Sequence, residues 1–161
     1  MNYVALSQEI MCGKIESLSP YLNSRHKWMI GKEHNLSKKG LSIAQREYLG
    51  YSKDTQMKNF SDLRITKEQS LRLFKDDIDV CVNDLRFIFK DFDSYSEELQ
   101  HIFIVLEFQF GYDSFRGIYD TIRLVKNGEL KNAAIALRQS FIGQTHLSEY
   151  IDTLASRLEN C

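Results

Sequence analysis

Cysteine and histidine side chains are the commonest metal ligands and nucleophiles, and the chain has three cysteines and four histidines. Neither set has the spacing of a known site: the sequence contains no CxxC pair and no HExxH motif. The residues concerned are Cys12, Cys81 and Cys161, with His26, His101 and His146 among the histidines. We therefore expect no metal site and no cofactor. An odd number of cysteines without a secretory signal predicts reduced thiols and a cytoplasmic protein.

The charge balance excludes several classes of partner. The 161 residues include 21 lysines and arginines against 22 aspartates and glutamates, a net charge of −1. With this balance, we expect no electrostatic attraction of the protein to nucleic acid or to an anionic membrane surface. The longest apolar run, Ile102–Leu106, is too short to span a bilayer. A segment with Lys38, Lys39, Arg46, Lys53 and Lys58 is mildly basic, and we interpret it as a solvated surface.

Aromatic residues are frequent between residues 87 and 119. They are Phe87, Phe89, Phe92, Tyr95, Phe103, Phe108, Phe110, Tyr112, Phe115 and Tyr119. A base-stacking platform would need basic residues among them, so we expect them to form a hydrophobic core. Trp28 stands apart near the N-terminus, where it either packs under a small lobe or anchors a partner.

The elements that position these residues are mostly helical. Apolar residues recur every three or four positions from Leu71 to Phe89, and Thr66 with Gln69 forms a capping-box motif. A long helix of about six turns is therefore predicted. Ser94 and Glu97 are expected to begin a second helix, apolar on all sides from Leu99 to Phe110, and Gly111 to end it. Helical stripes follow within residues 112–126, 130–141 and 147–158.

The N-terminal part differs from the rest. Residues 1–19 could contain a helix, and Trp28–Gly31 is typical of a small hairpin. The sequence thus predicts an α+β, predominantly α-helical chain of one domain, residues 1–161. We expect a small mixed lobe over about residues 13–65 and a connecting helix over about residues 66–90. A helical lobe over about residues 91–161 would include the N-terminal helix.

The order of several short motifs resembles that of the T-even type of phage lysozymes. From residue 65 onward the motifs are Ile65-Thr66-Lys67-Glu68, Leu73-Phe74, Asp77-Ile78-Asp79, Phe108-Gln109-Phe110-Gly111, Gly117, Arg123, Ala133-Ala134, Leu137, Ser140 and Gln144-Thr145. Before residue 65 they are Tyr21, Ile30-Gly31 and His34. The resemblance covers nearly the whole chain and implies a lysozyme-like fold.

The resemblance also implies where catalysis would occur. Family members cleave peptidoglycan glycans with a glutamate, an aspartate and a threonine, and these three positions fall on Lys14, Asn23 and Met29. Glycoside hydrolysis needs an acid to protonate the leaving oxygen and a second polar group to position water. Lysine, with an ordinary pKa of about 10.4, is a poor acid at neutral pH, and neither asparagine nor methionine replaces its counterpart. We expect no retained catalytic residue.

Further substitutions agree with lost catalysis. Glu33 stands where the family's hairpin has a glycine, Phe141 replaces an arginine and Ser148 replaces another. A shifted register of the first helix would bring Glu9 or Glu16 toward the cleft, although without its two partners. His34 and Asp77 match a pair that joins the lobes in the family, and we interpret them as a structural ion pair.

Three functions remain open at this point. The first is a phage-derived, catalytically inactive lysozyme-like protein that binds another protein, as an inhibitor of a host defence factor, a regulator of lysis or an assembly part. Its expected contact residues are Trp28, Lys32 and Glu33. The second is a peptidoglycan-cleaving endolysin with a rearranged active site. The third is a glycan-binding module that keeps the groove without the chemistry.

Overall fold

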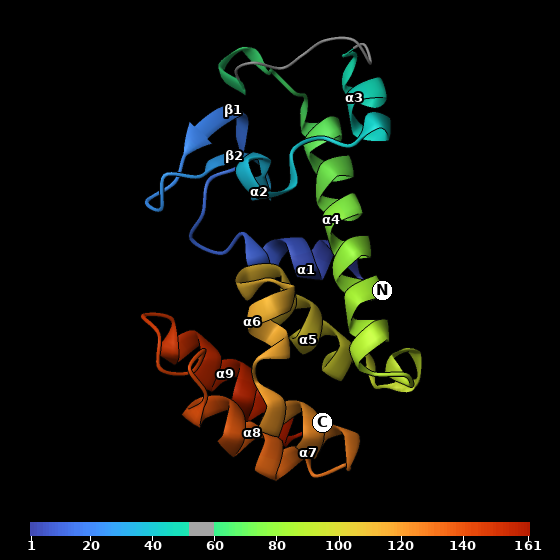
Figure 1. Cartoon of the computed structure of the whole chain (residues 1–161), viewed down its shortest axis with the longest axis vertical. Coiled ribbons are helices and arrows are strands. Elements are labelled where there is room, and N and C mark those ends of the chain that lie inside the picture. Colours follow the sequence, from blue (N-terminus) through green and yellow to red (C-terminus); the bar gives the residue numbers. More distant parts are fainter. Residues whose placement is uncertain (52–59) are drawn as a thin grey trace. The chain divides into compact units, whose positions relative to one another are not determined.

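The structure is a computed structural model that describes residues 1–51 and 60–161. Lys53 and Lys58 of the expected basic segment lie outside the described residues. The chain divides into two compact units, which we call the hairpin unit (Asn2–Asp77) and the helical unit (Ile78–Cys161 together with Met1). The predicted class, α+β and mostly helical, is confirmed (Figure 1).

The hairpin unit contains a three-stranded antiparallel sheet in the order β1-β2-β3. Its elements are α1 (Tyr3–Ile10), β1 (Ser17–Leu22), β2 (Trp28–Gly31), β3 (His34–Asn35), α2 (Leu36–Lys39), α3 (Ile43–Leu49), η1 (Phe60–Asp62) and the first turns of α4 (Lys67–Ile88). The predicted hairpin at Trp28–Gly31 is therefore present, and a third strand extends it. The N-terminal helix is shorter than residues 1–19 because it ends before Gly13, whose φ of +71° is not helical.

A small apolar cluster forms the core of the hairpin unit. Its buried members are Ile30, Leu36, Leu41, Leu49, Leu63, Ile65 and Leu73. Trp28 is partly buried and packs against this cluster, as do Tyr48 and Phe60. The only tryptophan of the chain thus contributes its ring to the core of this unit.

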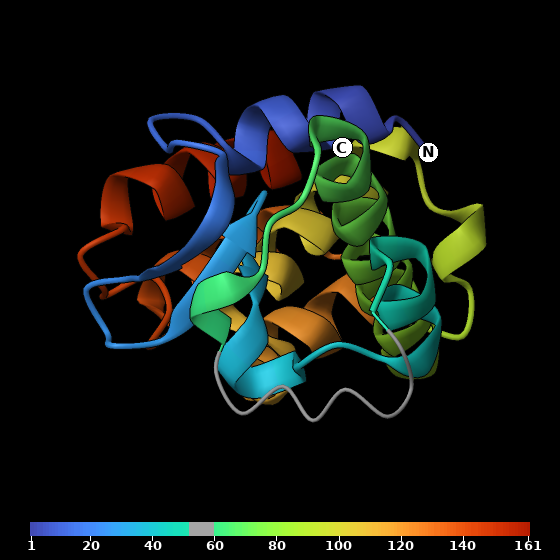
Figure 2. The ribbon, with the colours of Figure 1, turned by 90° about the horizontal axis from the view of Figure 1, so that it is seen from above.

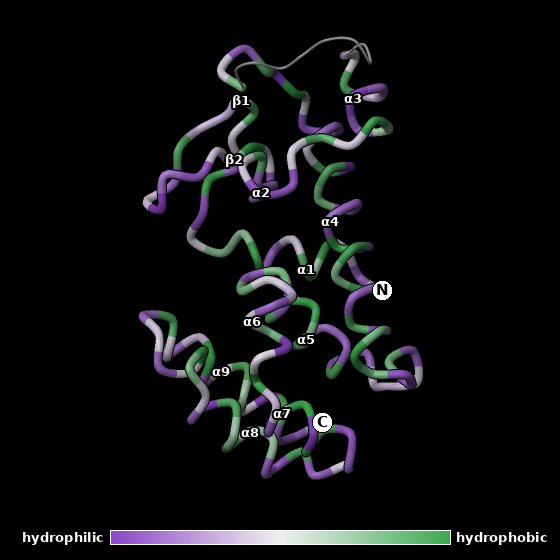
Figure 3. The backbone as a smooth tube through the Cα atoms, in the orientation of Figure 1, coloured by the Kyte–Doolittle hydropathy of each residue, from purple (hydrophilic) through white to green (hydrophobic). Residues whose placement is uncertain are grey.

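The long helix α4 begins with the capping box that the sequence predicts. Thr66 and Gln69 exchange two hydrogen bonds, of 2.8 Å to Gln69 Oε1 and 3.1 Å to Thr66 Oγ1. Hydrophobic and hydrophilic residues alternate along the helix (Figure 3). Its first turns lie beside α3 (Figures 1 and 2), and Tyr48 Oη donates a 3.0 Å hydrogen bond to Asp76 that joins the two helices.

The helical unit contains the rest of α4 and six further elements. They are η2 (Phe92–Ser94), α5 (Glu97–Phe110), α6 (Tyr112–Arg116), α7 (Tyr119–Lys126), α8 (Leu130–Gln139) and α9 (Ser148–Glu159). Helix α5 is buried along most of its length, as predicted. Its N-cap is Ser96 rather than Ser94, because Ser94 belongs to the short helix η2 and the Ser96 hydroxyl accepts from the Leu99 amide.

Four phenylalanines occupy the core of the helical unit. Phe89 stacks on Phe103 with ring centroids 5.0 Å apart, and Phe115 meets Phe103 edge-on at 5.8 Å. Phe92 is also buried, so the predicted aromatic core is confirmed for these four. It is wrong for Phe87, which is 67% exposed, and for Tyr119, which is 71% exposed. Phe87 lies two residues from Phe89, about 200° around the same helix, so the two rings cannot share a face.

Within residues 1–51 and 60–161, no helix is long and apolar enough to cross a membrane.

Candidate functional site

The three positions that the resemblance assigns to catalysis hold side chains that form structural contacts. Met29 is 6% exposed and belongs to the buried side of β2. Asn23 Oδ1 accepts hydrogen bonds from the amides of Arg25 and Lys27, both of 3.0 Å, and so shapes the turn between β1 and β2. Lys14 Nζ lies 3.4 Å from Glu33 Oε2. A core residue, a turn residue and an ion-paired cation therefore stand where the family would hold its catalytic groups.

Glu33 is the centre of a first polar cluster. Its carboxylate accepts a 2.7 Å hydrogen bond from Tyr21 Oη as well as the contact from Lys14. Burial, the hydrogen bond to Glu33 and the charge of Glu33 raise the pKa of Tyr21 well above its usual value. The phenol therefore stays protonated and keeps donating. Tyr21 on β1 lies opposite Met29 on β2, so its side chain reaches along the sheet to the β2–β3 turn that carries Glu33.

The backbone of Glu33 is strained. Its φ is +67°, in the left-handed region that a residue with a Cβ adopts at a cost of roughly 1–2 kcal/mol. A glycine would adopt this conformation without that cost. A glutamate at a strained position that also forms two side-chain bonds points to a requirement for its carboxylate.

Glu16 is the centre of a second polar cluster beside the first. Its Oε1 accepts a 2.6 Å hydrogen bond from Ser70 Oγ, and its Oε2 lies 3.6 Å from Lys32 Nζ. Ser70 belongs to α4, which approaches the end of β2 so closely that a Cβ on Gly31 would lie 2.7 Å from Ser70 Oγ. Gly31 also has a φ of +61°, so both space and conformation require glycine at this turn.

The two clusters fix the short segment between α1 and β1. Lys14 and Glu16 both turn toward the β2–β3 turn, and their side chains are 30% and 23% exposed. Ile15 between them is 85% exposed. Alternating side chains are what an extended segment produces. The result is a pinned segment whose charges are already paired with neighbours of the same unit.

The paired carboxylates lack the arrangement of a general acid. Such an acid must hold its proton on an oxygen that points at the leaving group. Both oxygens of Glu33 and both of Glu16 instead face hydroxyl or ammonium donors of the protein. Chemically, the site can present ion pairs and hydrogen-bonding groups to a ligand.

A buried ionic group joins β3 to α4. His34 Nδ1 lies 2.9 Å from Asp77 Oδ2, and His34 Nε2 lies 2.8 Å from the Gly40 carbonyl oxygen. Both ring nitrogens face acceptors, so both bonds form only when the ring carries two protons. Lys39 Nζ contacts the other Asp77 oxygen at 2.9 Å. Burial acts to raise the pKa of Asp77, but the hydrogen bond and charge of His34 and the contact with Lys39 outweigh it and hold that pKa below its usual value.

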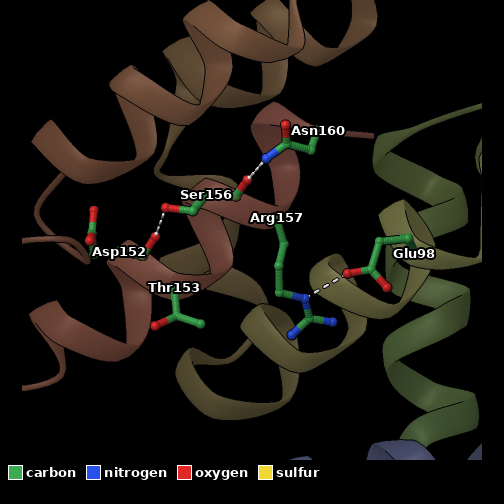
Figure 4. Close-up of a pocket in the computed structure, with 6 residues that line it drawn as sticks. All are labelled: Glu98, Asp152, Thr153, Ser156, Arg157 and Asn160. Carbon is green, nitrogen blue, oxygen red and sulfur yellow. Dashed lines mark hydrogen bonds and ion pairs between the residues drawn. The ribbon is translucent and has the colours of Figure 1, made fainter.

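The helical unit has an open pocket of about 510 Å³ between α5 and α9. Figure 4 shows the Arg157 guanidinium pointing at Glu98, with Nε and Oε1 2.6 Å apart. The other lining residues are Asp152, Thr153, Ser156 and Asn160. Ser156 and Asn160 donate hydrogen bonds to carbonyl oxygens of α9. Asp152 pairs with Arg138 and Thr153 donates to the Glu149 carbonyl oxygen, so the polar groups of this pocket have partners within the helical unit, and we assign it no role.

Residues 1–51 and 60–161 contain no group of three or more histidine, cysteine, aspartate or glutamate side chains that could hold a metal ion. Cys12 and Cys161 are exposed free thiols, and Cys81 is a buried one. The exposure of Cys161 agrees with its place at the end of the sequence.

Sequence reasoning missed the partners in both polar clusters. In the sequence, Tyr21 has only its place in a motif, and Glu16 only the role of a displaced acid. Strand register gives no signal for the bond from Tyr21 to Glu33, because Tyr21 pairs with Met29, beside the β1–β2 turn. The bond from Ser70 to Glu16 joins residues 54 positions apart, and no local pattern signals it.

No protein-family model matches the sequence, and no curated protein gives a significant match to it.

Proposed function

We propose that this chain is a phage-derived, catalytically inactive protein of lysozyme-like fold that binds another protein. Inhibition of a host defence factor and regulation of lysis in the host cytoplasm are roles that such a binder could fill. The observation that carries the proposal is the ion pair between Lys14 and Glu33. Lys14 stands at the position that the resemblance gives to the general acid, and Glu33 pairs with its ammonium group.

The electrostatics of that position oppose glycoside cleavage. The reaction develops positive charge on the sugar ring, which an anionic site stabilises. Lys14 there offsets the negative charge of Glu33, so the pair supplies no net anionic charge, and Met29 offers no hydroxyl that could position water. Loss of a general acid alone lowers a rate by about 10²–10⁴. Glu16, the acid of the alternative endolysin hypothesis, is engaged by Ser70 and Lys32.

A lysis assay tests the proposal directly. Gram-negative cells with a permeabilised outer membrane would be mixed with the purified protein, and clearing would be followed by turbidity. An active phage lysozyme serves as the positive control. We expect the natural protein to leave the suspension turbid, because the acid, the aspartate and the threonine are all replaced. Clearing by the natural protein would overturn the proposal, and Glu9→Gln and Glu16→Gln variants would then identify the acid.

A designed variant sharpens the assay. Lys14→Glu, Asn23→Asp and Met29→Thr restore the three residue types of the family, but Lys14→Glu also places a second carboxylate beside Glu33. Adding Glu33→Gly removes this repulsion and relaxes the strained turn. Circular dichroism would first show that each variant is folded. Lysis by the fourfold variant alone would support a lysozyme-like groove in which only the chemistry was lost.

A further inference from the structure

The two units carry opposite net charges. The hairpin unit has 13 lysines and arginines against 9 aspartates and glutamates, a net charge of +4. The helical unit has 8 against 13, a net charge of −5. Charges on a surface act mainly within a Debye length of about 8–10 Å. A chain whose total charge is close to zero can therefore still attract an anionic partner to the hairpin unit.

Some cations of the hairpin unit are already paired, and others are not. Those that contact a carboxylate of the same unit within 3.6 Å include Lys14, Lys32 and Lys39. Arg25, Lys27 and Lys38 are exposed. None of these three forms an ion pair in the described part of the chain. We call Arg25, Lys27 and Lys38 the basic edge.

The turn between β1 and β2 holds the first two cations of the basic edge. Asn23 Oδ1 accepts hydrogen bonds from the amides of both Arg25 and Lys27 at 3.0 Å. The Asn23 amide donates a further 3.0 Å bond to the Lys27 carbonyl oxygen. Because these bonds use backbone atoms of Arg25 and Lys27, the charged groups of the two side chains remain available to a partner.

A contact between β2 and α2 places the third cation near the other two. The Trp28 amide donates a 2.8 Å hydrogen bond to Ser37 Oγ, and β2 and α2 lie side by side (Figures 1 and 2). Lys27 and Lys38 are the sequence neighbours of these two residues, so standard bond lengths put the Cα atoms of the two lysines within roughly 11 Å of each other. Arg25 precedes Lys27 by two residues, so the row of three cations is at most about 19 Å long.

The sequence around the basic edge lacks acidic residues. Residues 22–32 and 34–46 contain no aspartate or glutamate. Glu33, between the two ranges, follows the opposite end of β2 and is already in an ion pair. Beside β1, η1 contributes Asp62, and Arg64 balances its charge two residues later. The charge of the basic edge and of the segments that carry it is therefore net positive.

We propose that the basic edge is the docking surface for an extended acidic segment of a protein partner. Carboxylates along the segment pair with Arg25, Lys27 and Lys38, and their charge selects an acidic segment over a neutral or basic one. An extended chain advances about 3.3 Å per residue, so six residues are long enough to follow the whole row. The inference names the partner chemistry of the proposed protein-binding function and rests on that function for its biological setting.

A nucleic acid fits the same edge less well than an acidic protein segment. Single strands bind largely by stacking bases on exposed aromatic rings, and Trp28, the aromatic residue next to the basic edge, packs against the apolar cluster instead. A nucleic acid is also a long polyanion, which the net charge of −5 on the helical unit repels. A short acidic segment contacts the basic edge alone.

The test is an NMR titration of the ¹⁵N-labelled full chain with the synthetic peptide acetyl-EEEEEE-amide. We expect saturable shifts in residues 23–28 and 36–39, with a dissociation constant on the order of 1 mM that increases with the salt concentration. The matched probes are acetyl-KKKKKK-amide, which reverses the charge, and acetyl-GSGSGS-amide, which removes it. Both should bind at least tenfold more weakly. Single-stranded hexathymidylate, which carries a similar charge on phosphates, should also bind more weakly than the acidic peptide.

Variants separate the basic edge from the rest of the surface. A triple variant with Arg25→Glu, Lys27→Glu and Lys38→Glu should weaken binding of the acidic peptide at least tenfold. A second triple variant with glutamine at the same positions removes the charges without adding repulsion, and it should also weaken binding at least tenfold. Lys67→Glu is the matched control, because Lys67 is an exposed lysine of the same unit outside the basic edge. Its binding should stay within twofold of the natural protein.

Several results would overturn the proposal. They are the absence of a saturable shift, shifts confined to residues outside the basic edge, equal binding of the acidic and neutral peptides, and hexathymidylate binding as tight as that of the acidic peptide. Shifts of the basic edge that grow with protein concentration in the absence of peptide would assign the surface to a second copy instead. A turbid lysis assay with a failed titration would reject the basic edge alone, whereas clearing with a successful titration would reject the inactive-lysozyme proposal alone.

Discussion

The hairpin unit and the helical unit differ in the contacts that stabilise each of them. In the hairpin unit a small apolar cluster is supplemented by polar bridges between distant segments, such as Lys14 to Glu33 and His34 to Asp77. In the helical unit a group of stacked phenylalanines fills the core, and ion pairs such as Arg86 to Asp93 lie on the surface. Exposed ion pairs contribute about 0–1 kcal/mol to the free energy of unfolding. Removing one partner of a buried ion pair, in contrast, strongly destabilises the fold.

The stability of each unit therefore depends on a separate physical variable. The hairpin unit should respond to charge and pH, because its bridges require ionised groups. The helical unit should respond to side-chain volume, because packed interiors tolerate cavities poorly. Substitutions in the two units therefore test whether their stabilities depend on these two variables.

The largest effect is expected from Phe103→Ala in the helical unit. The ring is fully buried between Phe89 and Phe115, so its loss leaves a cavity and lowers the free energy of unfolding by about 3–5 kcal/mol. Urea unfolding followed by circular dichroism at neutral pH measures the change. Phe87→Ala is the control, and its effect should stay within about 0.5 kcal/mol. Equal losses in the two variants would contradict a volume-dependent core.

The next effect is expected from Asp77→Asn in the hairpin unit. The variant keeps the shape of the side chain but leaves the buried His34 facing no anion, and we expect a loss of about 3 kcal/mol at pH 7. Since the pKa of Asp77 is lowered in the folded state, its stabilisation is present above the unfolded value of 3.8 and disappears as the pH falls through the folded value. The difference in stability between the natural protein and the variant should therefore begin to shrink below about pH 4 and disappear once the pH falls below the folded pKa of Asp77.

Urea unfolding at several pH values between 7 and 3 measures this convergence. Lys39→Met is a useful control because Lys39 is 37% exposed, so its contact with Asp77 should contribute less than about 1 kcal/mol. A difference between the natural protein and Asp77→Asn that stays constant to pH 3 would contradict a lowered pKa of Asp77 in the folded protein.

The smallest net effect is expected from Glu33→Gly. The change removes the bonds to Tyr21 and Lys14 but also relieves the left-handed strain, so the two contributions oppose each other. We expect unfolding free energy within about 0.5 kcal/mol of the natural protein, whereas Glu33→Gln, which keeps the strain and loses the charge, should cost about 1 kcal/mol. Thermal unfolding of the three proteins side by side provides the measurement. A Glu33→Gly protein as unstable as Glu33→Gln would mean that the turn is not strained.

Local patterns predicted the elements well. The capping box at Thr66, the apolar stripe of α4 and the fully apolar run of α5 each depend on neighbours within a few residues, and each helix formed where expected. The start of α5 shifted from Ser94 to Ser96 because both serines can cap and only tertiary structure chooses between them. Grouping Phe87 with the aromatic residues expected in the core was wrong, whereas the helical period from Leu71 to Phe89 already leaves Phe87 off the apolar face.

The candidate site was less accessible to sequence reasoning. The positions of Lys14, Glu33 and Trp28 in the chain were identified, but the bonds that engage them depend on strand register and on the approach of α4 to Gly31. The ring of Phe141 lies against Gly117, a contact across 24 positions that no residue pattern encodes. Contacts of this kind require the assembled unit.

The strained turn at Glu33 has an evolutionary consequence. If a glycine there leaves folding stability nearly unchanged, selection for folded protein alone would let glutamate and glycine exchange freely in a library randomised at this codon. Enrichment of glutamate in such a library under selection for biological activity would therefore measure the demand for the carboxylate itself. Because the φ of Glu33 is +67°, selection at this one codon distinguishes a requirement for folding from a requirement for function.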